Sequence, residues 1–257
     1  MGKKGVKSAM RTFEVLELFE EKRKPLRLHE IYSSLEYPQS STTNLLKSMV
    51  SMGYLNYNRR NRTYLPSTRI NMLGNWLHGY FQSSGGYRSL AEELQRRIDE
   101  TVGIVCQNDL YIQYIIMLTP AHEHKLPPNA GTMRLMTDSS TGLALMARMK
   151  DRAIEKIWRF TNYYKLSENN SYSLPELMRE VNWVRKVGYA YIAKRATPVT
   201  SSIAMTLDED LFGIPMAIGV GGMADRIAKN QHDIVETMRD LIERFSKEQV
   251  NYNLENK

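Results

Sequence analysis

The stretch PQSSTTNLLKSMVSMGYL, residues 38–55, determines how the first part of the chain is expected to fold. Pro38 suits the first turn of a helix, and Gly53 is a natural residue for the end of that helix. On a helical wheel one arc of the segment is suited to face a core: Thr42, Leu45, Leu46, Met49 and Met52. The opposite arc carries hydroxyls, an amide and a cation, but no carboxylate: Ser40, Thr43, Asn44, Lys47 and Ser51.

The acid-free face of this predicted helix calls for an explanation, because acids ordinarily stabilise the start of a helix. Asn can bond adenine with two hydrogen bonds, Ser and Thr bond base edges or phosphates, and a Thr methyl contacts the thymine methyl. An acid in the first turn would repel phosphate, whereas its absence keeps the helix N–H groups open to an anion. The pattern favours a helix that lies in the major groove of DNA over a surface helix without a role.

Short elements on both sides complete a recognisable pattern. Helices are expected at about 8–21, after Ser8 as N-cap, and at about 28–36, and residues 54–66 predict two short strands around a basic turn. In the first helix the apolar residues at helical spacing are Met10, Phe13, Leu16 and Phe19. Three helices followed by a hairpin predict a winged helix-turn-helix domain. The cations placed to reach phosphates are Arg59, Arg60 and Arg62 at the hairpin tip and Lys3, Lys4 and Lys7 in an N-terminal arm.

The distribution of charge agrees with this interpretation. The formal net charge of the 257-residue chain is +7. Residues 1–66 hold 12 Lys and Arg against 6 Asp and Glu, a net of +6, and the remaining 191 residues hold 23 against 22, a net of +1. Such asymmetry indicates a module that binds a polyanion joined to a neutral one, although a solvated basic surface is the simpler alternative.

Composition limits the remaining classes. The chain is 42% hydrophobic and 25% charged, as in ordinary globular proteins, and it contains no apolar run long enough to cross a membrane. The N-terminus is basic but lacks the apolar region of a secretory signal, and Cys106 has no second cysteine with which to form an internal disulfide. These features predict a cytoplasmic protein without a membrane partner.

A linker is expected between the two modules. A helix predicted at 67–82 carries a wide apolar stripe: Leu73, Trp76, Leu77, Tyr80 and Phe81. Because this stripe is too apolar for a solvated linker, we expect it to pair with its copy in a homodimer, and two dimers can join as a tetramer. QSSGG at 82–86 is a candidate hinge. The expected organisation is a DNA-binding domain at 1–66, a linker at 67–86 and a second domain at 87–257.

The second domain has an α/β pattern. Strands are predicted at VGIVCQ, LYIQYIIML, YAYIAKRA, SSIAMTL and IPMAIGVGG. Helices are predicted at about 87–100, at 139–160 with a break near Lys150 and Asp151, and at 225–249. Pro175 is expected to open a further helix that Gly188 stops.

Along nearly its whole length the chain resembles the IclR family of bacterial transcription regulators. The segments that carry the resemblance are SAMRTFEVLELF, LRLHEIYSSL, YPQSSTTNLLKSMVSMGYL, RTYLPSTRINMLG, SSTGLALMARM and VRKVGYAYIAKRA. The resemblance implies an α+β protein with a winged helix-turn-helix domain, a linker helix and a C-terminal α/β, GAF-like domain that binds an effector. It also implies that the residues reading DNA are Gln39, Ser40, Ser41, Thr43 and Asn44, with Lys47 on the same helix face.

The chain departs from the family pattern at three places. Family members often have Arg where Asn44 stands. The family motif Thr-Ala-x-Gly-Lys-Ala is replaced by Ser139-Ser140-Thr141-Gly142-Leu143-Ala144, so that Leu143 takes the place of Lys. Where relatives often have Gly and then Cys, this chain has Thr200-Ser201-Ser202.

A small organic acid is the expected effector. The helix start Ser139, Ser140, Thr141 and Gly142 offers N–H groups to a carboxylate. The expected apolar wall is Met133, Leu135 and Met136, and Ser201 and Ser202 would add hydroxyls. The alternative is that these residues only pack the core.

Other motifs favour no enzyme, metal or cofactor. GVGGMA at 219–224 lacks the second strand of a dinucleotide fold, and HEH at 122–124 lacks a third ligand for a metal. Asp208, Glu209 and Asp210 fit a hairpin turn better than a catalytic group. We therefore expect a regulator that binds a palindromic operator in double-stranded DNA. The alternatives are an α/β enzyme with an appended nucleic-acid-binding domain and a DNA-binding architectural protein.

Overall fold

The computed structural model describes residues 6–83, 86–120, 130–167, 173–193, 198–211 and 213–255, and for 77–83, 209–211 and 249–255 it describes the backbone alone. The predicted Lys3, Lys4 and HEH segment, and the side chains of Leu77, Tyr80 and Phe81, lie outside the described residues. The chain forms two compact units, Met1–Tyr80 and Phe81–Lys257, which divide within the helix that follows the first hairpin. None of the described helices combines the length and apolar character needed for a membrane crossing.

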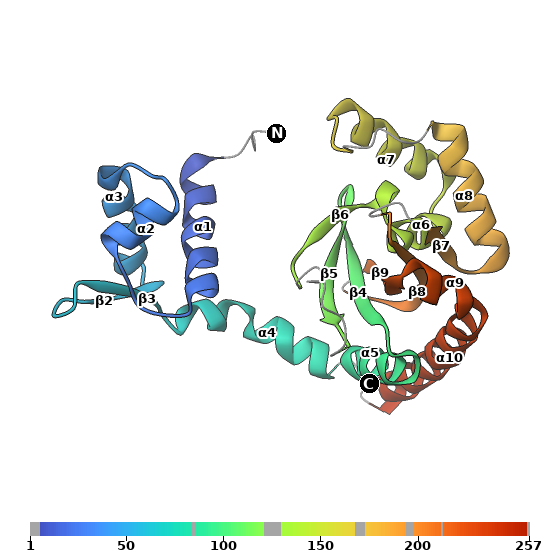
Figure 1. The fold of residues 1–257 in the computed structure, drawn as a ribbon. Coiled ribbons are helices and arrows are strands. Elements are labelled where there is room, and N and C mark those ends of the chain that lie inside the picture. Colours follow the sequence, from blue (N-terminus) through green and yellow to red (C-terminus); the bar gives the residue numbers. More distant parts are fainter. Residues whose placement is uncertain are drawn as a thin grey trace. The chain divides into compact units, whose positions relative to one another are not determined.

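The first unit is a winged helix-turn-helix, as predicted (Figure 1). Its elements are α1 (Lys7–Lys22), β1 (Leu26–Arg27), α2 (Leu28–Ser34), α3 (Gln39–Ser51), β2 (Leu55–Asn58), β3 (Thr63–Pro66) and α4 (Arg69–Ser83). The strands form an antiparallel sheet in the order β1-β3-β2. The short strand β1 was not predicted, because two residues carry no periodic pattern.

The core of this unit explains which face of α3 turns inward. Thr42, Leu46 and Met49 are buried, and the Thr42 hydroxyl donates to the Pro38 carbonyl at 3.0 Å. Met52 was expected in the same arc, but its side chain is 59% exposed. Met52 is the C-cap of the helix, one turn beyond the last buried residue, and the chain turns away at Gly53, whose φ is 79°.

The second unit is built on a six-stranded antiparallel sheet in the order β6-β5-β4-β9-β8-β7. Its strands are β4 (Thr101–Asn108), β5 (Tyr111–Leu118), β6 (Met133–Leu135), β7 (Ala190–Ala193), β8 (Thr200–Leu211) and β9 (Ile214–Met223). Its helices are α5 (Tyr87–Ile98), η1 (Met136–Asp138), α6 (Ser140–Ala147), α7 (Asp151–Tyr163), α8 (Leu174–Val187), α9 (Ala224–Lys229) and α10 (Gln231–Glu255). The mixed α/β architecture agrees with the prediction.

The helices lie in two groups on opposite faces of the sheet (Figure 1). One core joins residues of α6, α7 and α8 to Val105, Ile112, Ala204 and Ala217 on the strands. On the other face α5 and α10 pack together, with the Tyr87 and Phe245 rings 5.0 Å apart. The two faces of the sheet are therefore covered by different helices.

Predicted helix boundaries in this unit rest on local chemistry. Pro175 lies in the first turn of α8, where Ser173 and Glu176 form a capping box, and Gly188 ends the helix with a φ of 82°. The break between α6 and α7 falls at Lys150, which is the N-cap of α7. These predictions are confirmed. The expected final helix is divided into α9 and α10, which meet at Asn230.

Candidate nucleic-acid interface and effector site

The outer face of α3 presents polar groups and no carboxylate. Ser40, Asn44, Lys47 and Ser51 are exposed, as is Gln39, and the first turn contains no acidic residue. Within the described part of the chain, the Asn44 amide and the Lys47 ammonium are neither hydrogen-bonded nor ion-paired. The face is therefore open to an external partner.

The hydroxyls of this helix are already oriented by the backbone. Ser41 Oγ donates to the Pro38 carbonyl at 2.9 Å, and Thr43 Oγ1 donates to the Gln39 carbonyl at 2.8 Å. Because each hydroxyl has one proton, a further partner can use these oxygens only as acceptors. Ser41 and Thr43 are half-buried, whereas Ser40 is exposed.

A cation that the sequence did not reveal lies beside the start of α3. The Arg11 guanidinium, from α1, is 4.5 Å from the centre of the Tyr37 ring, and its Nη1 is 3.4 Å from Ser41 Oγ. The Tyr37 hydroxyl donates to the Glu14 carboxylate. Stacking on an aromatic face restricts the motion of a guanidinium without neutralising its charge. Arg11 thus adds a fixed positive charge next to Ser41.

The wing between β2 and β3 exposes its three arginines. Asn58 Oδ1 accepts from the backbone N–H of Arg60 at 3.0 Å and of Asn61 at 3.1 Å, which holds the turn. Arg59, Arg60 and Arg62 are all exposed. Arg62 has a φ of 55°, a backbone conformation that non-glycine residues adopt infrequently.

In the second unit, the start of α6 is enclosed by the protein. Ser139 caps the helix by accepting from the Gly142 N–H at 3.0 Å, and residues 139–142 are buried. A side chain on Gly142 would overlap the backbone of Met136, so glycine is required there. Thr141 is 4% exposed, and its buried hydroxyl has no hydrogen-bond partner among the described residues.

The register of the sheet separates the two predicted serines. Ser202 pairs with Gly221, two residues from Gly219, against which the Thr141 methyl packs. Ser201 pairs with Gly222, which faces Glu100 and α9. Neighbouring residues in a strand point to opposite faces. Ser202 therefore shares a face with α6, and Ser201 lies on the other face, which differs from the prediction that both line one pocket.

The same alternation changes the predicted apolar wall. Met133 pairs with Gln113, and the Asn108 amide lies 4.0 Å from the Met133 sulfur on that side. Leu135, two residues further along β6, points to the same side as Met133, away from α6. Both had been predicted in the wall of the pocket. Met136 remains in the core beneath α6 and is fully buried.

The residue of β6 on the α6 side is Arg134. It pairs with Ile112, which belongs to the core under α6. Tyr114 shares that face, and its ring lies 3.1 Å from the position that a Cβ on Gly103 would occupy. Burial raises the pKa of the Tyr114 phenol, and the positive charge of Arg134 partly opposes this. Arg134 and Tyr114 are functional candidates that the sequence did not single out, because alternation along a strand does not say which of its two faces meets α6.

Alternative chemistry finds little support in the described part of the chain. No three side chains of His, Cys, Asp or Glu are grouped there to hold a metal ion. Cys106 is buried in β4, and burial raises the pKa of its thiol, so the reactive thiolate is disfavoured.

Comparisons with known proteins agree with this arrangement. The family model of the IclR helix-turn-helix domain matches residues 8–59, and that of the bacterial transcriptional regulator IclR C-terminal domain matches residues 87–247. A comparison with curated proteins found no match.

Solved structures show the same fold. The effector domain of an IclR transcriptional regulator from Acinetobacter sp. ADP1 is 27% identical, with a TM-score of 0.60, over 64% of this chain and 96% of that one. A transcriptional regulator from Rhodococcus sp. RHA1 is 16% identical, with a TM-score of 0.71, over 96% of this chain and 99% of that one.

A third structure, from Microbacterium hydrocarbonoxydans, is an IclR homolog complexed with 4-hydroxybenzoate. It is 16% identical, with a TM-score of 0.68, over 91% of this chain and 95% of that one. The C-terminal family model alone matches more than half of the chain, and the helix-turn-helix model matches most of the rest. The chain therefore belongs to the IclR family of bacterial transcriptional regulators.

Proposed function

We propose that this regulator reads an operator in duplex DNA with α3 and that a small carboxylate, bound beneath α6, changes its affinity for that operator. The observation that carries the proposal is the exposed face of α3, which combines an amide, hydroxyls and a cation with no acid in the first turn. A helix N-terminus of this kind attracts phosphate, and its side chains match base edges.

The DNA contacts divide into readers and positioners. Gln39, Ser40 and Asn44 are exposed and carry groups that bond base edges, while Ser41 and Thr43 offer acceptor oxygens. Lys47 and Arg11 lie beside these residues and suit phosphates. At the wing, Arg62 has an unfavourable backbone conformation, which supports a functional role for its side chain.

The proposed effector site joins three groups on one face of the sheet. The start of α6 supplies N–H groups without acceptors in their own helix, at Ser140 and Thr141. Arg134 supplies a positive charge on the same face of the sheet, and Ser202 supplies a hydroxyl. A guanidinium binds a carboxylate with two parallel hydrogen bonds. The carboxylate held by the Microbacterium homolog supports this class of effector.

A homodimer is part of the proposal. On α4, Met72, Leu73 and Trp76 are each more than half exposed, and the Trp76 side chain is 63% exposed. Paired with its copy, this surface would produce a two-fold dimer and hence a palindromic operator. Light scattering should show a dimer or tetramer at micromolar concentration, and Trp76→Glu should shift it toward monomer. A monomeric wild type would contradict this part.

The experiment uses an operator selected from random duplexes, with 4-hydroxybenzoate and short aliphatic acids as candidate effectors. One of these acids should raise the melting temperature and change operator affinity, because a ligand that binds the folded state stabilises it. Arg134→Gln should weaken the binding of that acid by about tenfold or more. The matched control is Arg152→Gln, on the exposed face of α7. Equal responses of the two variants would place the acid elsewhere. Full sequence preference retained in every α3 variant would contradict the reading of DNA by α3.

A further inference from the structure

The outer face of α7 carries three cations and a tyrosine in a single line, which we call the α7 stripe. Arg152, Lys156, Arg159 and Tyr163 follow one another at intervals of four, three and four residues, and all four are exposed. Residues at this spacing project from the same side of a helix. From the first to the last of them the helix rises by about 17 Å. The stripe is therefore a continuous surface about three turns long.

The cations of the α7 stripe are not neutralised by acids of the same helix. Among the described residues none of the three is ion-paired, although the exposed Glu155 lies between Arg152 and Arg159. The acid at the start of the helix, Asp151, lies 2.8 Å from Arg185 of α8. The stripe and its border thus hold three cations against the one carboxylate of Glu155.

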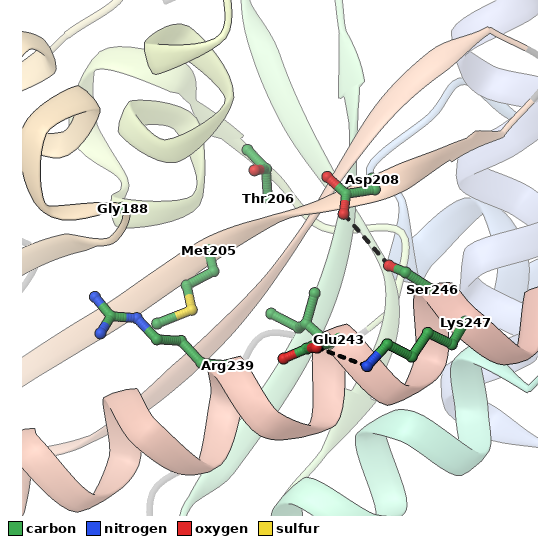
Figure 2. Close-up of a pocket in the computed structure, with 9 residues that line it drawn as sticks. Gly188, Met205, Thr206, Asp208, Arg239, Glu243, Ser246 and Lys247 are labelled. Carbon is green, nitrogen blue, oxygen red and sulfur yellow. Dashed lines mark hydrogen bonds and ion pairs between the residues drawn. The ribbon is translucent and has the colours of Figure 1, made fainter.

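The cations of α10 in the same unit are arranged differently. On that helix three cations each lie within 3.0 Å of a carboxylate on an adjacent turn: Arg239 with Glu236, Arg244 with Asp240, and Lys247 with Glu243. Figure 2 shows the last of these pairs. Exposed pairs of this kind add little stability, but they leave the surface nearly neutral. The α7 stripe instead keeps its positive charge available to an external partner.

Aromatic rings adjoin the stripe toward the end of α7. The Phe160 and Tyr164 rings are stacked with their centres 6.0 Å apart, and Tyr163 meets Tyr164 edge-on at 5.1 Å. The Arg159 guanidinium lies 5.6 Å and the Lys156 ammonium 5.9 Å from the centre of the Phe160 ring. Tyr163 is 76% exposed and Tyr164 is 48% exposed. The rings therefore attract the two cations and still leave apolar surface in water.

This combination of rings and cations favours a protein partner. Tyrosine and arginine are the residues most enriched in the energetically important parts of protein interfaces. The outer surface of duplex DNA offers phosphates but no apolar group for the rings to cover. A two-fold contact with a second copy of the chain would place the same cations opposite one another, where they repel. The surface thus fits a partner that supplies both carboxylates and apolar side chains.

We propose that the α7 stripe binds an acidic, amphipathic segment of another protein, about three helical turns long. Carboxylates of that segment pair with the three cations, and its apolar side chains cover Tyr163 and Tyr164. The stripe lies on the exposed side of α7, opposite the buried Ile154 and Ile157, whereas the proposed effector site lies beneath α6. The contact with a protein is therefore a property beyond the proposed binding of operator and effector.

The test is titration of the full chain, at low ionic strength, with a fluorescein-labelled peptide of three Glu-Glu-Leu-Leu repeats. As a helix this peptide carries carboxylates beside an apolar stripe. It should bind about tenfold more tightly than the corresponding Gln-Gln-Leu-Leu peptide, because three exposed ion pairs are lost in the latter. It should bind about fivefold more tightly than a peptide of Glu alone with the same length, which cannot cover the tyrosines.

Variants assign each preference to its side chains. Lys156→Gln combined with Arg159→Gln should abolish most of the preference for Glu over Gln, and Tyr163→Ala should abolish most of the preference for the peptide with leucines. The matched control is Arg244→Gln combined with Lys247→Gln, which removes the same charge from α10, where both cations are paired. That control should bind as wild type. All five side chains are exposed, so the variants should melt as wild type.

Four outcomes would overturn the proposal. One is no binding of the acidic peptide at millimolar concentration. Another is an equal loss in the α7 and α10 double variants, which would reduce the effect to net charge. A loss in Arg60→Gln that is absent from the α7 variant would assign the peptide to the winged helix. Finally, a slope of log affinity against log salt on random duplex that falls by about 0.9 per removed α7 cation would make the stripe a DNA contact.

Discussion

The starts of α3 and α6 have similar sequences and opposite environments. QSSTTN at 39–44 and SSTGLA at 139–144 are both rich in hydroxyls and free of acids. Gln39 and Ser40 are exposed, and α3 has no side-chain cap. Ser139 and Ser140 are buried, and Ser139 caps its own helix. The same letters therefore present N–H groups to solvent in one unit and to the protein interior in the other.

The difference follows from what lies around each helix start. A proline precedes α3, and its first turn projects from the small core of the winged helix. A 3₁₀ turn folds Met136 against Gly142 at the start of α6, so that the turn is enclosed. An open helix start suits a large polyanion, and an enclosed one suits a small anion that displaces little water. In the proposed function, the open start meets the operator and the enclosed start binds the effector.

The largest expected effect tests whether the enclosed start depends on its close backbone contact. Gly142→Ala places a methyl group into the Met136 backbone and should lower the unfolding free energy by about 3 kcal/mol. The matched control is Gly74→Ala, in exposed α4, where nothing lies within 4 Å of the added methyl. That control should stabilise by about 0.4–1 kcal/mol. Similar thermal denaturation of the two variants would contradict the close contact.

The next effect tests the open start. Asn44→Ala should cost roughly 1–3 kcal/mol at the selected operator and relax the preference at one base pair, because an amide reads adenine with two bonds. Ser51→Ala, at the far end of the same face, should cost much less. Electrophoretic titration on operator and on random duplex measures both. A uniform loss on every sequence would show that Asn44 contacts the backbone of DNA.

Local signals in the sequence were enough for the elements that end or begin at characteristic residues. Pro175 and Gly188 bound α8, Lys150 separates α6 from α7, and the hairpin of the wing follows Gly53. Proline and glycine act through their own backbone preferences, which do not depend on the rest of the fold. These predictions therefore held without knowledge of tertiary structure.

The assignment of side chains to a shared site depended on information that the sequence does not contain. Ser201 and Ser202 are adjacent, but which one faces α6 depends on how β8 pairs with β9. Arg134 was passed over for Met133 because the orientation of β6 is fixed by Ile112. Arg11 reaches Ser41 across 30 positions in the chain, a contact that no local pattern predicts.

A smaller effect separates the wing from the reading helix. Arg60→Ala should weaken operator and random DNA alike and should reduce the slope of log affinity against log salt by about 0.9 for one phosphate contact. Arg179→Ala removes the same charge from the exposed surface of α8 in the other unit and should leave the slope unchanged. A loss confined to the operator would make Arg60 a reader of bases.

The smallest effect appears only in alkaline solution and compares one buried tyrosine in each unit. Burial raises the pKa of Tyr114 in the effector unit and of Tyr64 in the winged helix, where the neighbouring Tyr57 raises it further. Above about pH 10 the unfolded chain loses these phenolic protons while the folded chain retains them, so stability falls as pH rises.

The Tyr114→Phe variant has no phenol to ionise at this position. It should therefore flatten the fall in stability of the unit that contains Trp158 and Trp183. Urea unfolding between pH 8 and pH 11 measures the slope, followed by tryptophan fluorescence in a Trp76→Phe background so that Trp158 and Trp183 alone report. Tyr64→Phe is the matched control from the other unit, and it should leave that fluorescence transition unchanged. An unaltered slope in Tyr114→Phe would mean that the phenol beside Arg134 is no less hydrated when folded than when unfolded.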